Sequence, residues 1–427
     1  MVFGEVKWRG KLPEVLNESV AWEEVLPILD QEKMYYGKLA VVKRLLIYFN
    51  DLPTKELAFK TVIDLVNQGY PYNVRPLFIT GDISPTAENY DFANSYNLYK
   101  ALFNRDQGMK KWSDDYFSKI DQKKFPKFIF YQALDAYSIG KLKEAISLLK
   151  DLLNVELDNP IFAKKVARTL ARIYYEQENY EKSLDIYNNF LLKVNPITPS
   201  DWLEAAWNLY FLNRYPESLG YLYNLESKTV DPWINIEKYV IRGLIYREMC
   251  DTLSMEFLIQ SFSVDFGDVI RKIKMGEPLQ TLPILKTIFS QEGDKFFTLS
   301  KVIAGLKYEK SNLVNIPPKF KFIMEFLYDT ELEHIQRVEK LYLDKALEQS
   351  ALSLVMMSEK LKFLKFGVER QKYNPDNIFQ ESTDKKNTPL LEHVDSKSFI
   401  VRWKQMGDFW IDERMNYKGI IENQCNN

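Results

Sequence analysis

Histidine and cysteine are scarce in this sequence, and their scarcity limits the chemistry available to the protein. Its 427 residues include two histidines, His334 and His393, and two cysteines, Cys250 and Cys425. A histidine-rich metal site or a paired-imidazole mechanism needs more histidine, and two cysteines form neither a four-cysteine zinc site nor a CxxC redox pair. We therefore expect no metal, no cofactor and no catalysis by histidine.

Glycine and proline are also sparse. Glycine (16) and proline (18) make about 8% of the chain, below the roughly 12% of average usage, while 46% of the residues are hydrophobic and 14% aromatic. This composition excludes a disordered, collagen-like or turn-rich all-β chain. It favours long helices.

Neither an excess of positive charge nor a long apolar run is present. The 57 basic and 59 acidic residues leave a net charge of −2, so no chain-wide basic field favours nucleic acid. No run approaches the ~20 apolar residues of a membrane span. Residues 1–7 have neither the basic nor the apolar region of a signal peptide. Either the protein is cytoplasmic, or a signal peptide precedes this sequence.

Common catalytic motifs are missing as well. The sequence contains no phosphate-binding GxxxxGK[ST] loop, GxGxxG behind a strand, GxSxG elbow, HExxH or acidic calcium loop. Adjacent carboxylates such as Glu23–Glu24, Asp114–Asp115 and Asp412–Glu413 point about 100° apart on a helix and are usually solvated. We expect no enzyme, and a helical cell-wall hydrolase with a carboxylate pair remains the remote alternative.

An internal repeat of tetratricopeptide length runs through the middle of the chain. Small residues that let two helices cross recur at intervals of 38, 35 and 37 residues, the last replaced by methionine: Ala145, Ser183, Ser218 and Met255. Twelve residues before each lies a second small residue: Ala133, Ala171, Ala206 and Gly243. Pro160, Pro196 and Pro232 stop the helices between units. These offsets predict four tetratricopeptide hairpins over 126–265, although an ordinary helical bundle could produce such spacings by chance.

The remaining segments complete a predicted all-α, tetratricopeptide-like solenoid. Helical spacing predicts N-terminal hairpins in 1–125, with helices over 54–67 and 87–103. It also predicts a helical region over 266–372 with a long helix over 329–371, which braces several repeats or pairs with 317–327. The polar composition of 373–397 predicts a surface linker. The aromatic tail, 398–427, should dock on the array because its rings are unfavourable in water.

The first helices of the repeats predict a concave groove for a protein partner. Aromatic and arginine side chains, which are enriched at binding hot spots, fall at the groove positions: Tyr137, Arg168, Arg172, Tyr175, Trp207, Tyr210 and Phe211. The pattern is not the Lys/Asn pattern that binds chaperone C-terminal carboxylates. The alternative is that these rings pack against the chain's own later helices.

Three segments resemble one protein family. The stretch 205–215 reads AAWNLYFLNRY, 238–250 reads KYVIRGLIYREMC, and 407–417 reads GDFWIDERMNY before the late Cys425. These segments resemble the tetratricopeptide envelope proteins of deltaproteobacteria, including those linked to gliding motility. The resemblance implies a periplasmic or outer-membrane-associated scaffold that binds other proteins of an envelope complex without catalysis. A cytoplasmic peptide-binding adaptor is the alternative.

The resemblance also bears on the two cysteines. The family resides in an oxidising compartment, where disulfides persist. Together with the even cysteine count and the apolar tail, this implies a Cys250–Cys425 disulfide that pins the tail to the fourth hairpin. The alternative is two unrelated reduced thiols.

Overall fold

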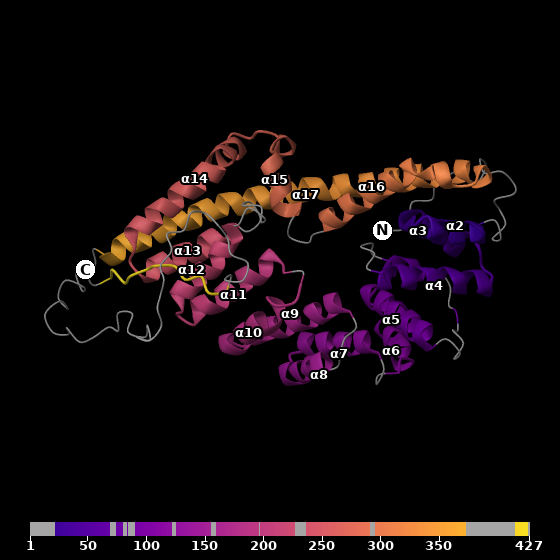
Figure 1. Cartoon of the computed structure of the whole chain (residues 1–427), viewed down its shortest axis with the longest axis horizontal. Coiled ribbons are helices and arrows are strands. Elements are labelled where there is room, and N and C mark those ends of the chain that lie inside the picture. The colour runs from indigo at the N-terminus through magenta and orange to yellow at the C-terminus, as the bar shows by residue number, and fades with distance from the viewer. Residues whose placement is uncertain are drawn as a thin grey trace. The chain divides into compact units, whose positions relative to one another are not determined.

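The computed structural model describes residues 22–68, 74–79, 83, 90–121, 125–154, 159–195, 197–226, 236–290, 295–372 and 415–425. The regular elements in these ranges are all helical (Figure 1), as the composition predicts. The chain divides into two compact units, residues 1–132 with 293–345 and residues 133–292 with 346–427. Helices α7 (Pro126–Ser138) and α17 (Pro318–Lys372) each contribute to both units.

The first unit is built around α3 (Tyr35–Tyr48), a helix whose central residues are all buried. The unit contains α2 (Val25–Gln31), α3, α4 (Leu52–Asn67), the 3-10 turn η2 (Arg75–Ile79), α5 (Tyr90–Asp106), α6 (Lys110–Ser118), α16 (Lys295–Ser311), the 3-10 turn η6 (Leu313–Asn315) and the start of α17. In α3, every residue from Gly37 to Leu46 is buried. Its apolar side chains share one core with α2, α4, α16 and α17.

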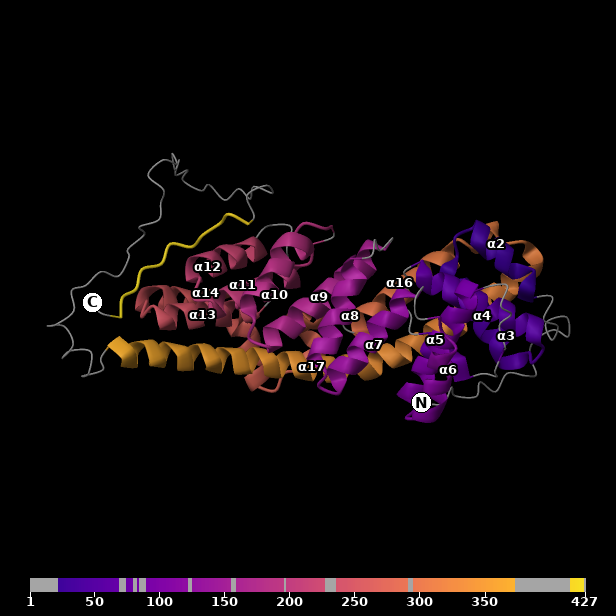
Figure 2. The same cartoon turned by 90° about the horizontal axis from the view of Figure 1, so that it is seen from below.

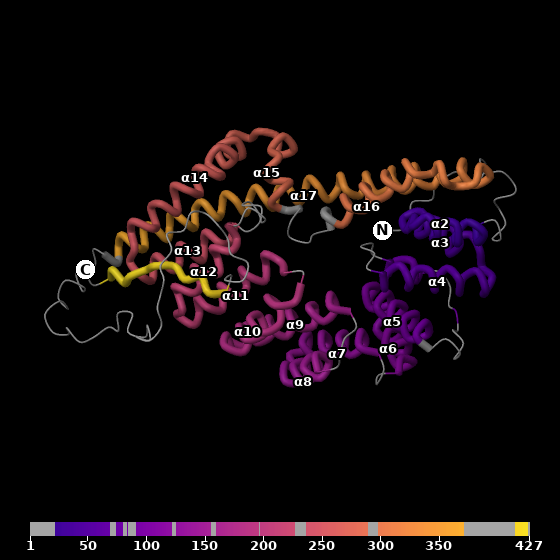
Figure 3. The backbone as a smooth tube through the Cα atoms, in the orientation of Figure 1, coloured from indigo at the N-terminus to yellow at the C-terminus, as the bar shows by residue number. Residues whose placement is uncertain are grey.

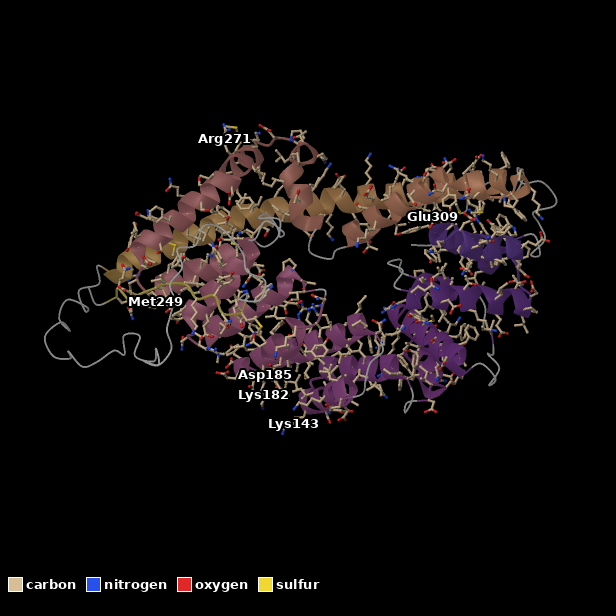
Figure 4. All side chains as sticks on the ribbon, in the orientation of Figure 1. Lys143, Lys182, Asp185, Met249, Arg271 and Glu309 are labelled. Carbon is tan, nitrogen blue, oxygen red and sulfur yellow. A yellow bond between two sulfur atoms is a disulfide. The ribbon has the colours of Figure 1, made fainter. Side chains whose placement is uncertain are left out.

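Two carboxylates, the buried Glu309 and the half-buried Glu331, tie α16 and α17 to α3. Glu309 (Figure 4) accepts hydrogen bonds from the N–H groups of Tyr36 and Gly37, at 2.9 and 2.8 Å, and from the Tyr328 hydroxyl at 2.8 Å. It therefore satisfies backbone donors at the N-terminus of α3, which have no partner within the helix. Glu331 forms an ion pair of 2.5 Å with Lys43.

The second unit is a stack of helical hairpins. Its helices are α8 (Leu142–Asn154), α9 (Pro160–Glu176), α10 (Tyr180–Ile186) with a π-helical turn (Tyr187–Leu191), α11 (Pro199–Phe211), α12 (Tyr215–Tyr223) with the 3-10 turn η4 (Asn224–Glu226), α13 (Glu237–Glu248), α14 (Thr252–Lys274), the 3-10 turn η5 (Leu279–Thr281) and α15 (Pro283–Ser290). Successive hairpins contact each other through α8 and α9, α10 and α11, and α11 and α13. This arrangement is an all-α solenoid (Figures 2 and 3).

One turn geometry recurs in the hairpins. The first helix of each is followed by a residue with a φ angle between 51° and 78°: Gly108, Gly140, Glu178, Asn213 and Cys250. The next N–H then bonds to the carbonyl five residues earlier, as from Asp251 to Tyr246 at 2.9 Å, which is the Schellman ending of a helix. The predicted small residues each follow this turn residue by five positions, so the repeat in sequence corresponds to a repeat in backbone geometry.

The same register places one of the predicted N-terminal hairpins in the repeat pattern, which the sequence analysis did not do. Gly108 lies between α5 and α6 of the first unit, and Ser113 follows it by five positions. Ala101 lies twelve positions before Ser113, and both residues are buried. The hairpin pattern therefore starts upstream of residue 126, where the repeats were predicted to begin.

The later helices differ in extent from the predictions. Helix α14 continues to Lys274, beyond the predicted limit of 265, and residues 318–327 belong to the continuous helix α17. The proposed pairing of that segment with the long helix is therefore wrong, and α16 is the separate helix before it. The C-terminal half of α17 packs on α13, where a Cβ atom on Gly243 would lie 3.0 Å from Leu364. The predicted linker, Pro196, Pro232 and the tail aromatics Phe399, Trp403, Phe409 and Trp410 lie outside the described residues.

Candidate partner-binding surface

Six aromatic side chains of the second unit form one contiguous cluster. This aromatic cluster consists of Tyr175, Tyr180, Trp207, Tyr210, Phe211 and Tyr215. Phe211 lies at its centre: its ring stacks on Tyr180 with centroids 4.8 Å apart and on Trp207 at 5.9 Å. It also meets Tyr175 and Tyr210 edge-on, at 5.7 and 5.2 Å. Such offset and edge-on pairs hold the rings in fixed positions.

The hairpin architecture places these rings together. Tyr175 and Phe211 lie in the last turns of the first helices α9 and α11, and Tyr180 and Tyr215 begin the second helices α10 and α12. Helix α11 starts with Pro199 behind a capping box, in which Thr198 and Asp201 satisfy each other's backbone N–H groups. These caps and the short turns fix the ends of the helices from which the rings project.

The cluster is half-buried. Trp207, Tyr210 and Tyr215 pack partly against the core of the second unit, whereas Phe211 keeps 41% of its surface exposed. Burial, together with the charges of nearby Tyr180, Glu237 and Glu204, raises the pKa of Tyr175 to about 12. Burial followed by the nearby Glu248 charge also raises the pKa of Tyr210 and Tyr215. The phenols therefore stay uncharged at neutral pH, and the surface is apolar with hydroxyl groups.

Arginine–glutamate pairs surround the cluster. Arg172 binds both carboxylate oxygens of Glu204, at 3.0 and 2.6 Å, and the hydrogen bond raises the pKa of Arg172. Arg247 pairs with Glu248 at 2.5 Å, and Arg214 with Glu217 at 2.5 Å. Each of these cations has a carboxylate beside it, so the surroundings carry charge without a large net excess of either sign.

The structure brings together four of the seven predicted groove residues as ring contacts: Tyr175, Trp207, Tyr210 and Phe211. Tyr137 instead donates a hydrogen bond to Glu176 at 2.5 Å. Arg168 binds the buried Asp201 carboxylate at 2.6 Å and Thr198 at 3.4 Å. The partner-binding roles of Tyr137, Arg168 and Arg172 stay predictions.

Tyr180 and Tyr215 also belong to the aromatic cluster, although they were not among the predicted groove residues. The two tyrosines occupy the first position of a second helix, 35 residues apart, which is one repeat. Their position follows the positive-φ residue by two, so the turn directs both rings toward the C-terminal ends of the first helices. The signal that could have found them is this shared turn position.

The two cysteines approach each other as the resemblance implies. Their Sγ atoms are 2.11 Å apart, at disulfide-bonding distance, and their Cα atoms 4.8 Å apart. Cys250 is buried at the turn between α13 and α14, and Cys425 belongs to residues 415–425, which we call the strap. The strap lies against α12 and α13 (Figure 1).

In the part of the chain that the structure describes, no group of three or more His, Cys, Asp or Glu residues could hold a metal ion. Over the same residues, no helix combines the length and the hydropathy needed to cross a membrane. No protein-family model matches the sequence, and no curated protein matches it.

Proposed function

We propose that the protein is a noncatalytic scaffold of tetratricopeptide repeats that binds another protein through the aromatic cluster. The observation that carries this proposal is the central Phe211, 41% exposed and held by four neighbouring rings. Rigid tyrosine and tryptophan side chains lose little conformational entropy on binding and dominate interface hot spots. A contiguous apolar surface of this kind typically marks an interaction site.

The tetratricopeptide assignment rests on two independent regularities. The small residues repeat in the sequence every 35 to 38 positions, and the positive-φ turns repeat at the same intervals. Ser218 and Ala206, one of the predicted pairs twelve residues apart, contact each other at 2.9 Å. Small residues at the crossing of two antiparallel helices are what this repeat requires.

The location that fits best is the bacterial envelope, in an assembly of the motility type. The resemblance of 205–215, 238–250 and 407–417 to envelope tetratricopeptide proteins supports it. The close approach of Cys250 and Cys425 supports an oxidising compartment such as the periplasm. The alternative, a cytoplasmic adaptor that binds peptides, requires both cysteines to be reduced in the cell.

Photo-crosslinking in living cells tests the binding role of the cluster. Phe211 is replaced by p-benzoylphenylalanine, which is similar in shape and reacts with neighbours on illumination. A matched control carries the same group at Val264, which is 79% exposed on α14 of the same unit. We expect a protein adduct from position 211 and none of the same mass from position 264. Equal adducts from both positions, or none from 211, would contradict the proposal.

A further inference from the structure

The strap lies as an extended peptide on the surface formed by α12 and α13. From Met415 to Glu422, half-buried and exposed residues alternate strictly, with Met415, Tyr417, Gly419 and Ile421 facing the protein. This period of two is the pattern of an extended chain that lies with one side on a surface. Figure 2 shows the strap as the yellow segment that runs beside α12.

Two glycines allow the backbones to approach closely. A Cβ atom on Gly220 of α12 would lie 1.7 Å from the carbonyl oxygen of Tyr417, and one on Gly419 would lie 2.5 Å from the side chain of Leu219. Neither position has room for any other residue without a shift of the strap. The surface of α12 is therefore shaped to accept a backbone.

The strap also makes directional contacts along its length. The Gly419 N–H donates to the Pro216 carbonyl at 2.7 Å, and the Gln424 N–H donates to the Met249 carbonyl at 2.8 Å (Met249 is labelled in Figure 4). The ring of Tyr417 meets that of Tyr223 edge-on at 5.4 Å. Main-chain bonds with pockets for alternate side chains are how proteins recognise extended peptides.

We infer that the surface of α12 and α13 beneath the strap is a docking groove for an extended peptide, and that the Cys250–Cys425 disulfide keeps this chain's own strap in it. Reduction by a dithiol would then release the strap and open the groove. The inference concerns a surface other than the aromatic cluster and does not depend on the proposed partner.

The reduction step follows from the positions of the two sulfurs. Cys425 is partly exposed, whereas Cys250 is 1% exposed. A thiolate of the dithiol attacks the Cys425 sulfur, the disulfide breaks, and Cys250 leaves as a thiolate that takes up a proton. The second thiol of the dithiol then attacks the mixed disulfide, which frees Cys425 and oxidises the dithiol to its own disulfide. Without the covalent bond, the contacts of the strap must offset the conformational entropy of eleven ordered residues.

A trapping experiment on the full chain tests recognition by the groove. The chain carries Cys425→Ser, and the probe is a peptide of residues 415–425 activated at its cysteine as the thionitrobenzoate disulfide. We expect the Cys250 thiolate to form a disulfide with this peptide at least tenfold faster than with a scrambled peptide, as the released thionitrobenzoate reports. Gly220→Ala should remove the difference. The control Gly367→Ala should keep it, because its Cβ would make an ordinary 3.5 Å contact with Arg247.

Hydrogen exchange of the wild-type chain tests release of the strap. Dithiothreitol should accelerate exchange of the Gly419 and Gln424 amides at least tenfold and leave the amides of α9 unchanged. The inference is overturned if the strap amides stay equally protected after reduction. It is also overturned if the amides of α9 lose protection together with them, because the disulfide would then stabilise the whole unit and not the strap alone. Equal trapping rates for the true and scrambled peptides would overturn it as well.

Discussion

The hydroxyl of Ser218 donates a hydrogen bond of 2.9 Å to the carbonyl oxygen of Ala206. Both residues are fully buried, and they lie where α12 crosses α11. Two residues that the repeat pattern places twelve positions apart in the sequence are thus in direct contact where two helices cross. Because neither residue has exposed surface, a larger side chain here would have to displace neighbouring atoms.

Ser218→Leu should therefore destabilise the second unit. Overpacking of a close helix crossing costs about 1–3 kcal/mol because the helices must separate. Urea unfolding followed by circular dichroism measures the change. The matched substitution Ser353→Leu, at an exposed position of α17, should stay within about 0.5 kcal/mol of the wild type. Equal losses of unfolding free energy for the two variants would contradict the claim that the helices cross closely at Ser218.

Asp201 forms ion pairs with two cationic side chains between neighbouring hairpins of the second unit. Its carboxylate has no exposed surface, accepts from Arg168 at 2.6 Å and lies 3.6 Å from the Lys164 ammonium, which is itself buried. Asp201→Ala leaves both charges without this partner and should cost about 3–5 kcal/mol in unfolding free energy. Glu217→Ala, which breaks the more exposed pair with Arg214, should cost less than about 1 kcal/mol. A small effect at Asp201 would mean that water reaches this site.

Glu331 should make the first unit sensitive to acid. Burial works to raise its pKa, but the charge of Lys43 at 2.5 Å, its hydrogen bond and the charge of Arg44 outweigh burial, so the pKa is lowered. Because the folded pKa lies below the unfolded value of about 4.3, this carboxylate stabilises the fold above that value. The stabilisation is lost as pH falls through the folded pKa. Urea unfolding between pH 6 and 3 should show a shallower loss for Glu331→Gln than for the wild type, and parallel curves would contradict this assignment.

The oxidation state of Cys250 and Cys425 in the cell distinguishes the two proposed locations. An envelope protein should show no alkylation at either cysteine when it is trapped with iodoacetamide before any reductant is added, because the oxidising compartment preserves the disulfide. Reduction before alkylation is the control that shows both cysteines can be modified. Labelling of both thiols without reductant would favour the cytoplasmic adaptor.

Local regularities made much of the second unit predictable from the sequence. The helix crossings depend on residues twelve positions apart, and the ends of the helices depend on a turn residue five positions before the second helix's small residue. Both are short-range patterns. The hairpin of α5 and α6 carries the same pattern at Ala101 and Ser113, and the turn at Gly108 could have identified it as part of the repeat.

Contacts between distant parts of the chain were not predictable in this way. Glu309 reaches Gly37 across 272 residues of sequence, and no local pattern links a carboxylate to a helix N-terminus that far away. The sequence predicted that the tail docks, but not that it does so as an extended chain. That form requires the backbone of Tyr417 to approach α12 closely, which is possible because Gly220 has no side chain. The groove positions identified four rings of the aromatic cluster. They did not reveal that Arg168 is held by Asp201, because that pair joins two adjacent hairpins.

The affinity of the partner trapped at position 211 is the most direct test of the binding account. The double variant Trp207→Ala, Phe211→Ala should weaken that affinity by at least thirtyfold, since each hot-spot truncation costs about 2 kcal/mol or more. Trp112→Ala, which removes an exposed tryptophan (59%) from α6, should leave it unchanged, and both variants should keep the wild-type circular dichroism spectrum. Isothermal titration calorimetry of the purified pair gives the three dissociation constants. Equal constants for all three proteins would contradict a partner-binding role for the aromatic cluster.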